Sequence, residues 1–424
     1  MKFAKLKMIE KLSTHGLIYF SNVEEPKSGL LEYNDNQINL TFVVEGFLDT
    51  LDELELDITN IVFITSFGEK LLLRDGIVLN SKNNSNNIIT IEVIYQYLLL
   101  DTNPQIESVS EENHYKNFKI YCSYFKDIFT NSPFRYGRKK EDRFHSSVEL
   151  NLESTLGLCI INNRMEVTDF ILANQYNRGE DFDLKFDYTP FLNFKFKEPQ
   201  SFNNIISQAM KIRNLISFIT EHQIKVEELY ISTKEKNYKI FWANESNIQV
   251  SKPSNELTFQ VKPFLNRRFS EFVDGYFNNE DKLTDIFDTY VNYIYKPIYE
   301  DDYLLSHIVI LEGLHRRFIC DKDITLKIRL EEMFKSLDRE IINSIFSEIE
   351  LDEKFISYLK DFRHYHSHFF DINKKPRIDG NKIEIAKLIR KVIKEFIYLK
   401  INVGESYVLA KPRQYQFKEL DNLK

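Results

Sequence analysis

The sequence predicts an α+β protein, in which a mainly-β N-terminal domain is followed by an all-α helical domain. Three observations support this fold class. Up to residue 161, apolar residues recur mostly in short runs separated by polar turns, which is typical of strands. After residue 262 they recur every three and four residues, which is typical of amphipathic helices. Glycine (12) and proline (10) are scarce among the 424 residues, which argues against a disordered chain.

The length of the chain predicts more than one domain, because 424 residues exceed what one ordinary hydrophobic core accommodates. The polar and turn-rich segment 244–254 is the best candidate for a linker. We therefore expect a mainly-β N-terminal domain over residues 1–252 and a helical domain over residues 253–424. The core of the helical domain is expected at about 303–402.

The N-terminal domain contains several β-branched and aromatic runs. Strands are predicted in chain order at residues 16–20, 29–33, 38–44, 61–65, 70–73, 88–94, 120–129, 146–161, 226–232 and 238–242. The turn at residues 34–36 predicts a hairpin between the second and third of these strands. Segment 135–143 is predicted to be a basic loop, which is either an exposed turn or a phosphate contact. Residues 202–222 are predicted to form an amphipathic helix.

The helical domain is predicted to contain helices over residues 303–318, 325–337, 338–349 and 383–401, with another that begins after Asp352. Asp352 is a favourable N-cap for this other helix. The last helix also carries a basic stripe at helical spacing, formed by Lys387, Arg390, Lys391 and Lys394. This stripe is either a solvated face or an RNA-binding surface.

Charge is distributed unevenly along the chain. The net charge is −8 in total, but residues 352–424 hold 16 Lys and Arg against 10 Asp and Glu, so they carry +6 and the preceding part carries −14. A local basic field suits a polyanionic ligand, although a solvated helical surface explains it equally well. The three cysteines are far apart, and no apolar run approaches the roughly 20 residues that span a bilayer. We expect a cytoplasmic protein with no membrane segment.

A cluster of one arginine and three histidines lies in the basic part, within Arg363–His368, although the chain has only nine histidines. Such groups are poor core material unless their polar atoms find partners. On a regular helix Arg363 and Ser367 share one side, and His364 shares another with His368. His366 points elsewhere, so His364 and His368 are the expected pair, and Arg363 completes the predicted working set if the end of the helix loosens.

Three interpretations of the cluster remain open on residue chemistry alone. In the first it is a metal-independent ribonuclease site, where a histidine transfers protons, an arginine binds the phosphate and RNA supplies its own 2′-hydroxyl nucleophile. In the second, His364 and His368 bind a metal with Asp371 or a distant acid as a further ligand. A neighbouring arginine disfavours a cation there. In the third, the cluster is structural or only contacts nucleic acid.

The motif Arg363-x-x-x-x-His368 resembles the RxxxxH signature of the HEPN superfamily. Segment 359–369 is similar to the C-terminal domain of ApeA-like antiphage HEPN proteins, in which the position after the arginine is polar, and here it is His364. Segment 310–318, which contains Glu312, resembles an upstream helix of the same family. The N-terminal part is also similar, through the strand at 29–31, the strand at 64–73 and the helix at 205–219.

This resemblance implies a HEPN-like helical bundle that forms a homodimer through the C-terminal domain, with two RxxxxH motifs in one composite site. It implies cleavage of RNA, with tRNA as one candidate, to a 2′,3′-cyclic phosphate and a 5′-hydroxyl, without a metal or cofactor. It also implies a role in abortive infection, a phage-derived trigger, and sensing or restraint by the N-terminal domain. Glu312 is either a buried structural acid or the group that orients Arg363. The alternative function is a non-catalytic scaffold or nucleic-acid sensor.

Overall fold

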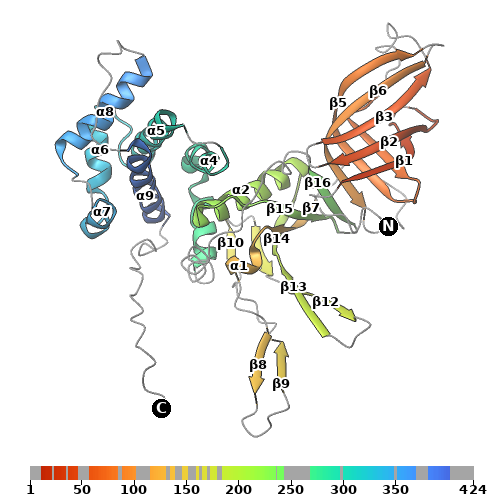
Figure 1. The fold of residues 1–424 in the computed structure, drawn as a ribbon, viewed down its shortest axis with the longest axis horizontal. Coiled ribbons are helices and arrows are strands. Elements are labelled where there is room, and N and C mark those ends of the chain that lie inside the picture. The colour runs from red at the N-terminus through yellow and green to blue at the C-terminus, as the bar shows by residue number, and fades with distance from the viewer. Residues whose placement is uncertain are drawn as a thin grey trace. The chain divides into compact units, whose positions relative to one another are not determined.

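The computed structural model divides the chain into two compact units, Met1–Asn266 and Arg267–Lys424 (Figure 1). The structure describes residues 11–21, 23–34, 37–45, 57–84, 88–101, 115–129, 134–138, 146–150, 159–161, 165–169, 172–178, 184–234, 236–242, 268–296, 299–347, 351–368 and 381–401. The linker predicted at 244–254 lies outside the described residues. The first unit is β-rich and the second is helical, so the predicted fold class is confirmed.

Six antiparallel strands of the first unit close into a small barrel (Figure 1). They are β1 (Leu12–Tyr19), β2 (Lys27–Asn34), β3 (Gln37–Glu45), β4 (Asn60–Thr65), β5 (Lys70–Asn84) and β6 (Ile88–Asp101). Their order is β6-β3-β2-β1-β4-β5, and β5 returns to pair with β6. Side chains alternate between the two faces of each strand, and on β3 every second residue, Ile38, Leu40 and Phe42, is buried. The predicted hairpin is confirmed by the antiparallel pairing of β2 with β3.

The sheet continues beyond the barrel from the C-terminal end of β6. It runs through β16 (Asn237–Trp242), β15 (Val226–Ser232), β7 (Tyr115–Cys122), β14 (Leu192–Gln200), β11 (Met165–Asp169) and β10 (Cys159–Ile161). Helix α2 (Phe202–Thr220) packs on this part, with its Phe202 ring 5.1 Å from that of Tyr97 and 6.2 Å from that of Tyr115. The predicted helix and the last two predicted strands of this unit are thereby confirmed.

Two predictions for the first unit need correction. The strand predicted at 120–129 ends at Cys122, and after a turn in which Tyr124 has a φ of 63° the chain forms helix α1 (Phe125–Phe129). In the predicted basic loop, Arg135–Arg138 belong to strand β8 (Phe134–Arg138), which pairs with β9 (Ser146–Leu150), and residues 139–143 lie outside the described part. A further hairpin joins β12 (Leu172–Arg178) to β13 (Leu184–Pro190), in a region where no strand was predicted.

The barrel requires glycine at position 16 because neighbouring strands approach closely there. A Cβ atom at Gly16 would lie 2.3 Å from the carbonyl oxygen of Ile64 and 2.6 Å from the ring of Phe63. Gly16→Ala is therefore expected to lower the free energy of unfolding by about 1–3 kcal/mol, because neither neighbour can move cheaply. Urea unfolding followed by fluorescence of the single tryptophan, Trp242, would measure this loss. Ser13→Ala, at an exposed position of the same strand, is the control, and equal stability of the two variants would contradict the prediction.

The second unit is a helical bundle arranged around α5 (Glu300–Phe318). After a helical segment over residues 268–278, it contains α4 (Glu280–Tyr295), α6 (Leu326–Lys335), α7 (Arg339–Ile345), α8 (Glu353–His368) and α9 (Lys382–Lys400). Helix α5 contacts α4, α6, α8 and α9, and its apolar face is buried at Leu304, Ile308, Leu311 and Leu314. Among the described residues, no helix combines the length and apolar character needed to cross a membrane.

Candidate functional site

Helix α8 presents the Arg363–His368 cluster because its opposite face is anchored in the core. Phe355, Leu359 and Phe362 are buried. The predicted N-cap is confirmed, since the Phe355 amide donates to the Asp352 carboxylate at 2.8 Å. The start and the rotation of the helix are thus fixed, and Arg363 is left half-buried on its side while His364 is exposed.

The carboxylate of Glu312 holds Arg363 from the neighbouring helix α5. Its Oε2 atom lies 3.2 Å from Nη2 of Arg363. Its Oε1 atom accepts from Nε and Nη2 of Arg316, at 3.2 and 3.0 Å. The side chain of Glu312 is only 13% exposed, so the acid lies beneath the two arginines. Two roles are predicted for Glu312, a buried structural acid or the group that orients Arg363. The ion pair with Arg363 is the contact that the second role requires.

Arg363 keeps hydrogen-bonding capacity after it pairs with Glu312. Its side chain is 31% exposed, and within the described part of the chain Nη1 has no assigned partner. The Nε atom also lacks a hydrogen-bond partner there, but it is buried. A guanidinium carries five N–H donors in a planar fork that matches the oxygens of a phosphate. Glu312 can therefore restrain Arg363 through Nη2 while Nη1 still offers donors to an anion.

The two histidines of the predicted working set differ in how far the structure describes them. The side chain of His364 is exposed on α8. His368 is the last residue of α8, and its side chain lies outside the described residues. Between them, the Ser367 hydroxyl donates to the carbonyl of Arg363 at 2.9 Å, one turn back. The backbone from 363 to 368 is one continuous helix, so within the described residues the helix end does not loosen to bring Arg363 beside His364 and His368.

His366 lies against a different part of the bundle. Its ring packs on that of Phe362, with centroids 4.4 Å apart, and its Nε2 atom is 3.9 Å from Oδ2 of Asp301 in the first turn of α5. Lys382, at the start of α9, pairs with the same carboxylate. Burial raises the pKa of the nearby Tyr358 to about 12, and the charge of Asp301 adds to this effect. His366 therefore joins the ends of three helices, whereas Arg363 contacts the C-terminal half of α5.

The basic stripe predicted on α9 is exposed only in part. Lys387 and Lys391 are exposed, and Lys387 pairs with Glu384 at 2.7 Å. Arg390 and Lys394 are buried instead. The guanidinium of Arg390 stacks 3.8 Å from the ring centroid of Tyr290 in α4, because a planar cation packs well on an aromatic face. The prediction of four basic residues on one exposed face is therefore corrected to two.

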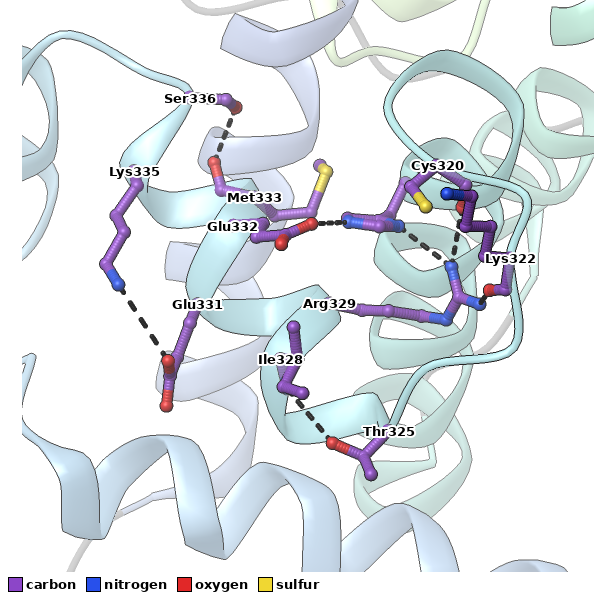
Figure 2. A network of polar contacts seen from close by, with 11 residues as sticks. Cys320, Lys322, Thr325, Ile328, Arg329, Glu331, Glu332, Met333, Lys335 and Ser336 are labelled. Atoms are coloured by element: carbon purple, nitrogen blue, oxygen red, sulfur yellow. Dashed lines mark hydrogen bonds and ion pairs between the residues drawn. The ribbon is translucent and has the colours of Figure 1, made fainter.

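A buried polar network fixes the C-terminal turn of α5 to helix α6 (Figure 2). Both Arg329 and His315 are 0% exposed. Nη1 of Arg329 donates to Nδ1 of His315 and to the Cys320 carbonyl, both at 2.9 Å, and Nη2 donates to the Lys322 carbonyl. Because arginine can only donate, Nδ1 of His315 accepts and its Nε2–H donates to Glu332 at 2.7 Å.

Arg329 was missed in the sequence, although a signal for it exists. It lies four residues before Met333 and so falls on the apolar face of α6, next to Leu330. A charged residue on the apolar face of a helix predicts a buried ionic or hydrogen-bonded contact. His315, by contrast, lies in segment 310–318, which resembles a helix of the HEPN family.

The metal-binding interpretation is not tested by the geometry. Among the residues that the structure describes, no three His, Cys, Asp or Glu side chains gather into a possible metal site. The imidazole of His368 and the whole of Asp371, the ligands proposed beside His364, lie outside that part. This alternative therefore stays open.

Comparison with known families assigns both units. A model described as ApeA N-terminal domain 1 matches residues 13–271, and a model described as Apea-like HEPN matches residues 305–401. The first match alone spans more than half of the chain, and the second contains Glu312, Arg363 and His368. Comparison with curated proteins found no match. The chain therefore belongs to the ApeA-like HEPN family, with an ApeA N-terminal domain followed by an Apea-like HEPN domain.

Proposed function

We propose that this protein is a metal-independent endoribonuclease of an antiphage abortive-infection system. Family membership indicates a nuclease-type function in defence against phage. The observation that carries the finer proposal is the position of Arg363. It lies on the helix that carries the RxxxxH motif, Glu312 restrains its Nη2 atom at 3.2 Å, and its side chain remains 31% exposed for contact with a phosphate.

The proposed reaction needs only proton transfer and charge stabilisation. The 2′-hydroxyl of RNA loses its proton and attacks the adjacent phosphorus, and the bond to the 5′-oxygen breaks as that oxygen gains a proton. The products are a 2′,3′-cyclic phosphate and a 5′-hydroxyl. His368 transfers a proton, because histidine titrates near neutral pH. Arg363 binds the phosphate and stabilises the charge that develops on it, and His364 assists by hydrogen bonding.

A homodimer would complete this site. One RxxxxH motif supplies one arginine and one motif histidine, whereas the reaction moves one proton away from the 2′-oxygen and another to the 5′-oxygen. Two motifs that face each other across a two-fold axis would supply one histidine for each transfer. HEPN domains typically act as dimers on RNA, which supports this part of the proposal. The exposed Lys387 and Lys391 are candidate contacts for the flanking RNA.

Purified protein incubated with total RNA, with and without EDTA, tests the proposal. We expect cleavage that survives EDTA, fragments with 2′,3′-cyclic phosphate and 5′-hydroxyl ends, and a dimer in sedimentation. Cleavage that is lost on chelation would instead favour the metal site at His364 and His368. The incubation is repeated with extract from phage-infected cells, which supplies a trigger. RNA binding without cleavage under both conditions would favour the scaffold or sensor function.

A further inference from the structure

One carboxylate brings two arginines of different helices together at the candidate site. Glu312 contacts Arg363 of α8 through Oε2 and Arg316 of its own helix, α5, through Oε1. Both guanidinium groups therefore lie within 3.2 Å of oxygen atoms of the same carboxylate. Arg316 did not belong to the predicted site, because spacing along α5 cannot show that α8 packs against that turn.

The charge and exposure of the two arginines suit the binding of an anion. The three groups together carry a net charge of +1, because one carboxylate serves two guanidinium groups. The side chain of Arg316 is 46% exposed and that of Arg363 is 31% exposed, whereas Glu312 lies beneath them. In the described part of the chain, Nη1 of Arg316 has no assigned partner. Both side chains thus present donors on the solvent side of a mostly buried acid.

We propose that Arg316 is a second phosphate-binding residue of the nuclease site, which holds the phosphate next to the scissile one in single-stranded RNA. The proposal rests on the proposed function, because it takes the Arg363 phosphate as the reacting one. Adjacent guanidinium groups suit successive phosphates of a nucleic-acid backbone, since each planar fork can donate to two oxygens. Glu312 then positions both arginines, and the substrate class is a phosphodiester chain longer than one linkage.

The neighbouring Arg317 shows how a purely structural arginine is placed on the same helix. Its Nη1 donates to the Lys282 carbonyl at 2.8 Å and its Nη2 to the Asp285 carboxylate at 2.9 Å, so it ties α5 to α4. It is 33% exposed, close to the exposure of Arg363. Arg316 makes no assigned contact of this kind within the described residues. Arg317 is therefore a matched control for charge and helix position.

Binding of an RNA that cannot be cleaved tests the assignment of Arg316 as a phosphate-binding residue. The probe is a labelled single-stranded RNA with 2′-O-methyl groups throughout, which lacks the attacking hydroxyl, and it is titrated with full-length protein at several salt concentrations. Arg316→Gln is expected to weaken binding roughly tenfold. It should also reduce the slope of log affinity against log salt by about 0.7, the value for one lost phosphate contact on a single strand. Arg316→Lys should restore most of the slope, and Arg317→Gln should leave it unchanged.

The outcomes separate this assignment from the proposed function. Wild-type affinity and slope in Arg316→Gln, at an unchanged melting temperature, would overturn the role of Arg316 even if the protein cleaves RNA. An equal loss of slope in Arg317→Gln would also overturn it, because the effect would then reflect net charge alone. A reduced slope confined to Arg316→Gln would support the contact even if the wild-type protein fails to cleave RNA, and in that case only the nuclease proposal falls.

Discussion

Proteins with His368→Ala or Arg363→Gln are expected to lose RNA cleavage by at least about a thousandfold while they keep their fold and their dimer. His368 transfers a proton in the proposed reaction, and Arg363 stabilises the charge on the phosphate. Groups that act as one unit give losses that do not add, so the double variant should be hardly slower than either single variant. Single-turnover rates on a defined RNA would measure these losses.

His366→Gln is the matched control for this prediction, because it removes an imidazole two residues away that contacts Asp301 and Phe362 rather than Glu312. It should retain most of the activity after any change in melting temperature is taken into account. A fully active His368→Ala protein would contradict the assignment of the proton-transfer group. A loss in His366→Gln as large as in His368→Ala that remains after this allowance would contradict the exclusion of His366 from the working set.

Local features of the candidate site follow from sequence periodicity. The position of Asp352 predicts where α8 begins, and the buried Phe355, Leu359 and Phe362 set its rotation, so the exposed position of His364 could be expected. Periodicity holds for residues within one helix because a regular backbone fixes their relative directions. It therefore separates His366 from His364 and His368 without any knowledge of the bundle.

Contacts between helices could not be predicted in the same way. Glu312 and Arg363 meet because α5 packs against α8, and a hydrophobic pattern does not name its partner. The burial of Arg390 depends on the ring and carbonyl of Tyr290, which lies 100 residues earlier in the chain. Long charged side chains are read as solvated in a helical pattern, and only tertiary packing supplies the aromatic face or carbonyl that makes burial acceptable. The barrel likewise depends on pairings between strands far apart in the sequence, β1 with β4 and β3 with β6.

Arg329→Met is expected to lower the stability of the helical unit by about 3–5 kcal/mol. The substitution keeps an unbranched apolar stem but removes the donors to His315 Nδ1, the Cys320 carbonyl and the Lys322 carbonyl. The ring of His315 is 0% exposed, so water does not readily replace the lost donor there. Because the same turn of α5 carries Glu312 and Arg316, activity should also fall at temperatures where the wild-type protein is still folded.

Two optical signals allow this loss to be assigned to one unit. Trp242 is the single tryptophan and lies in the first unit, so its fluorescence reports on that unit, whereas circular dichroism at 222 nm also reports on α4–α9. In urea, the dichroism transition of Arg329→Met should move to lower concentration while the fluorescence transition stays in place.

Arg317→Met is the matched substitution at an exposed ion pair and should cost less than about 1 kcal/mol, because its partner Asp285 is 83% exposed. The comparison isolates burial as the cause, since both variants lose one positive charge in the same bundle. An unchanged dichroism transition in Arg329→Met would show that water or a rearranged loop donates the lost hydrogen bonds to His315 and the two carbonyls. The turn that positions Glu312 would then depend on the apolar packing of Leu311 and Leu314 rather than on the buried network.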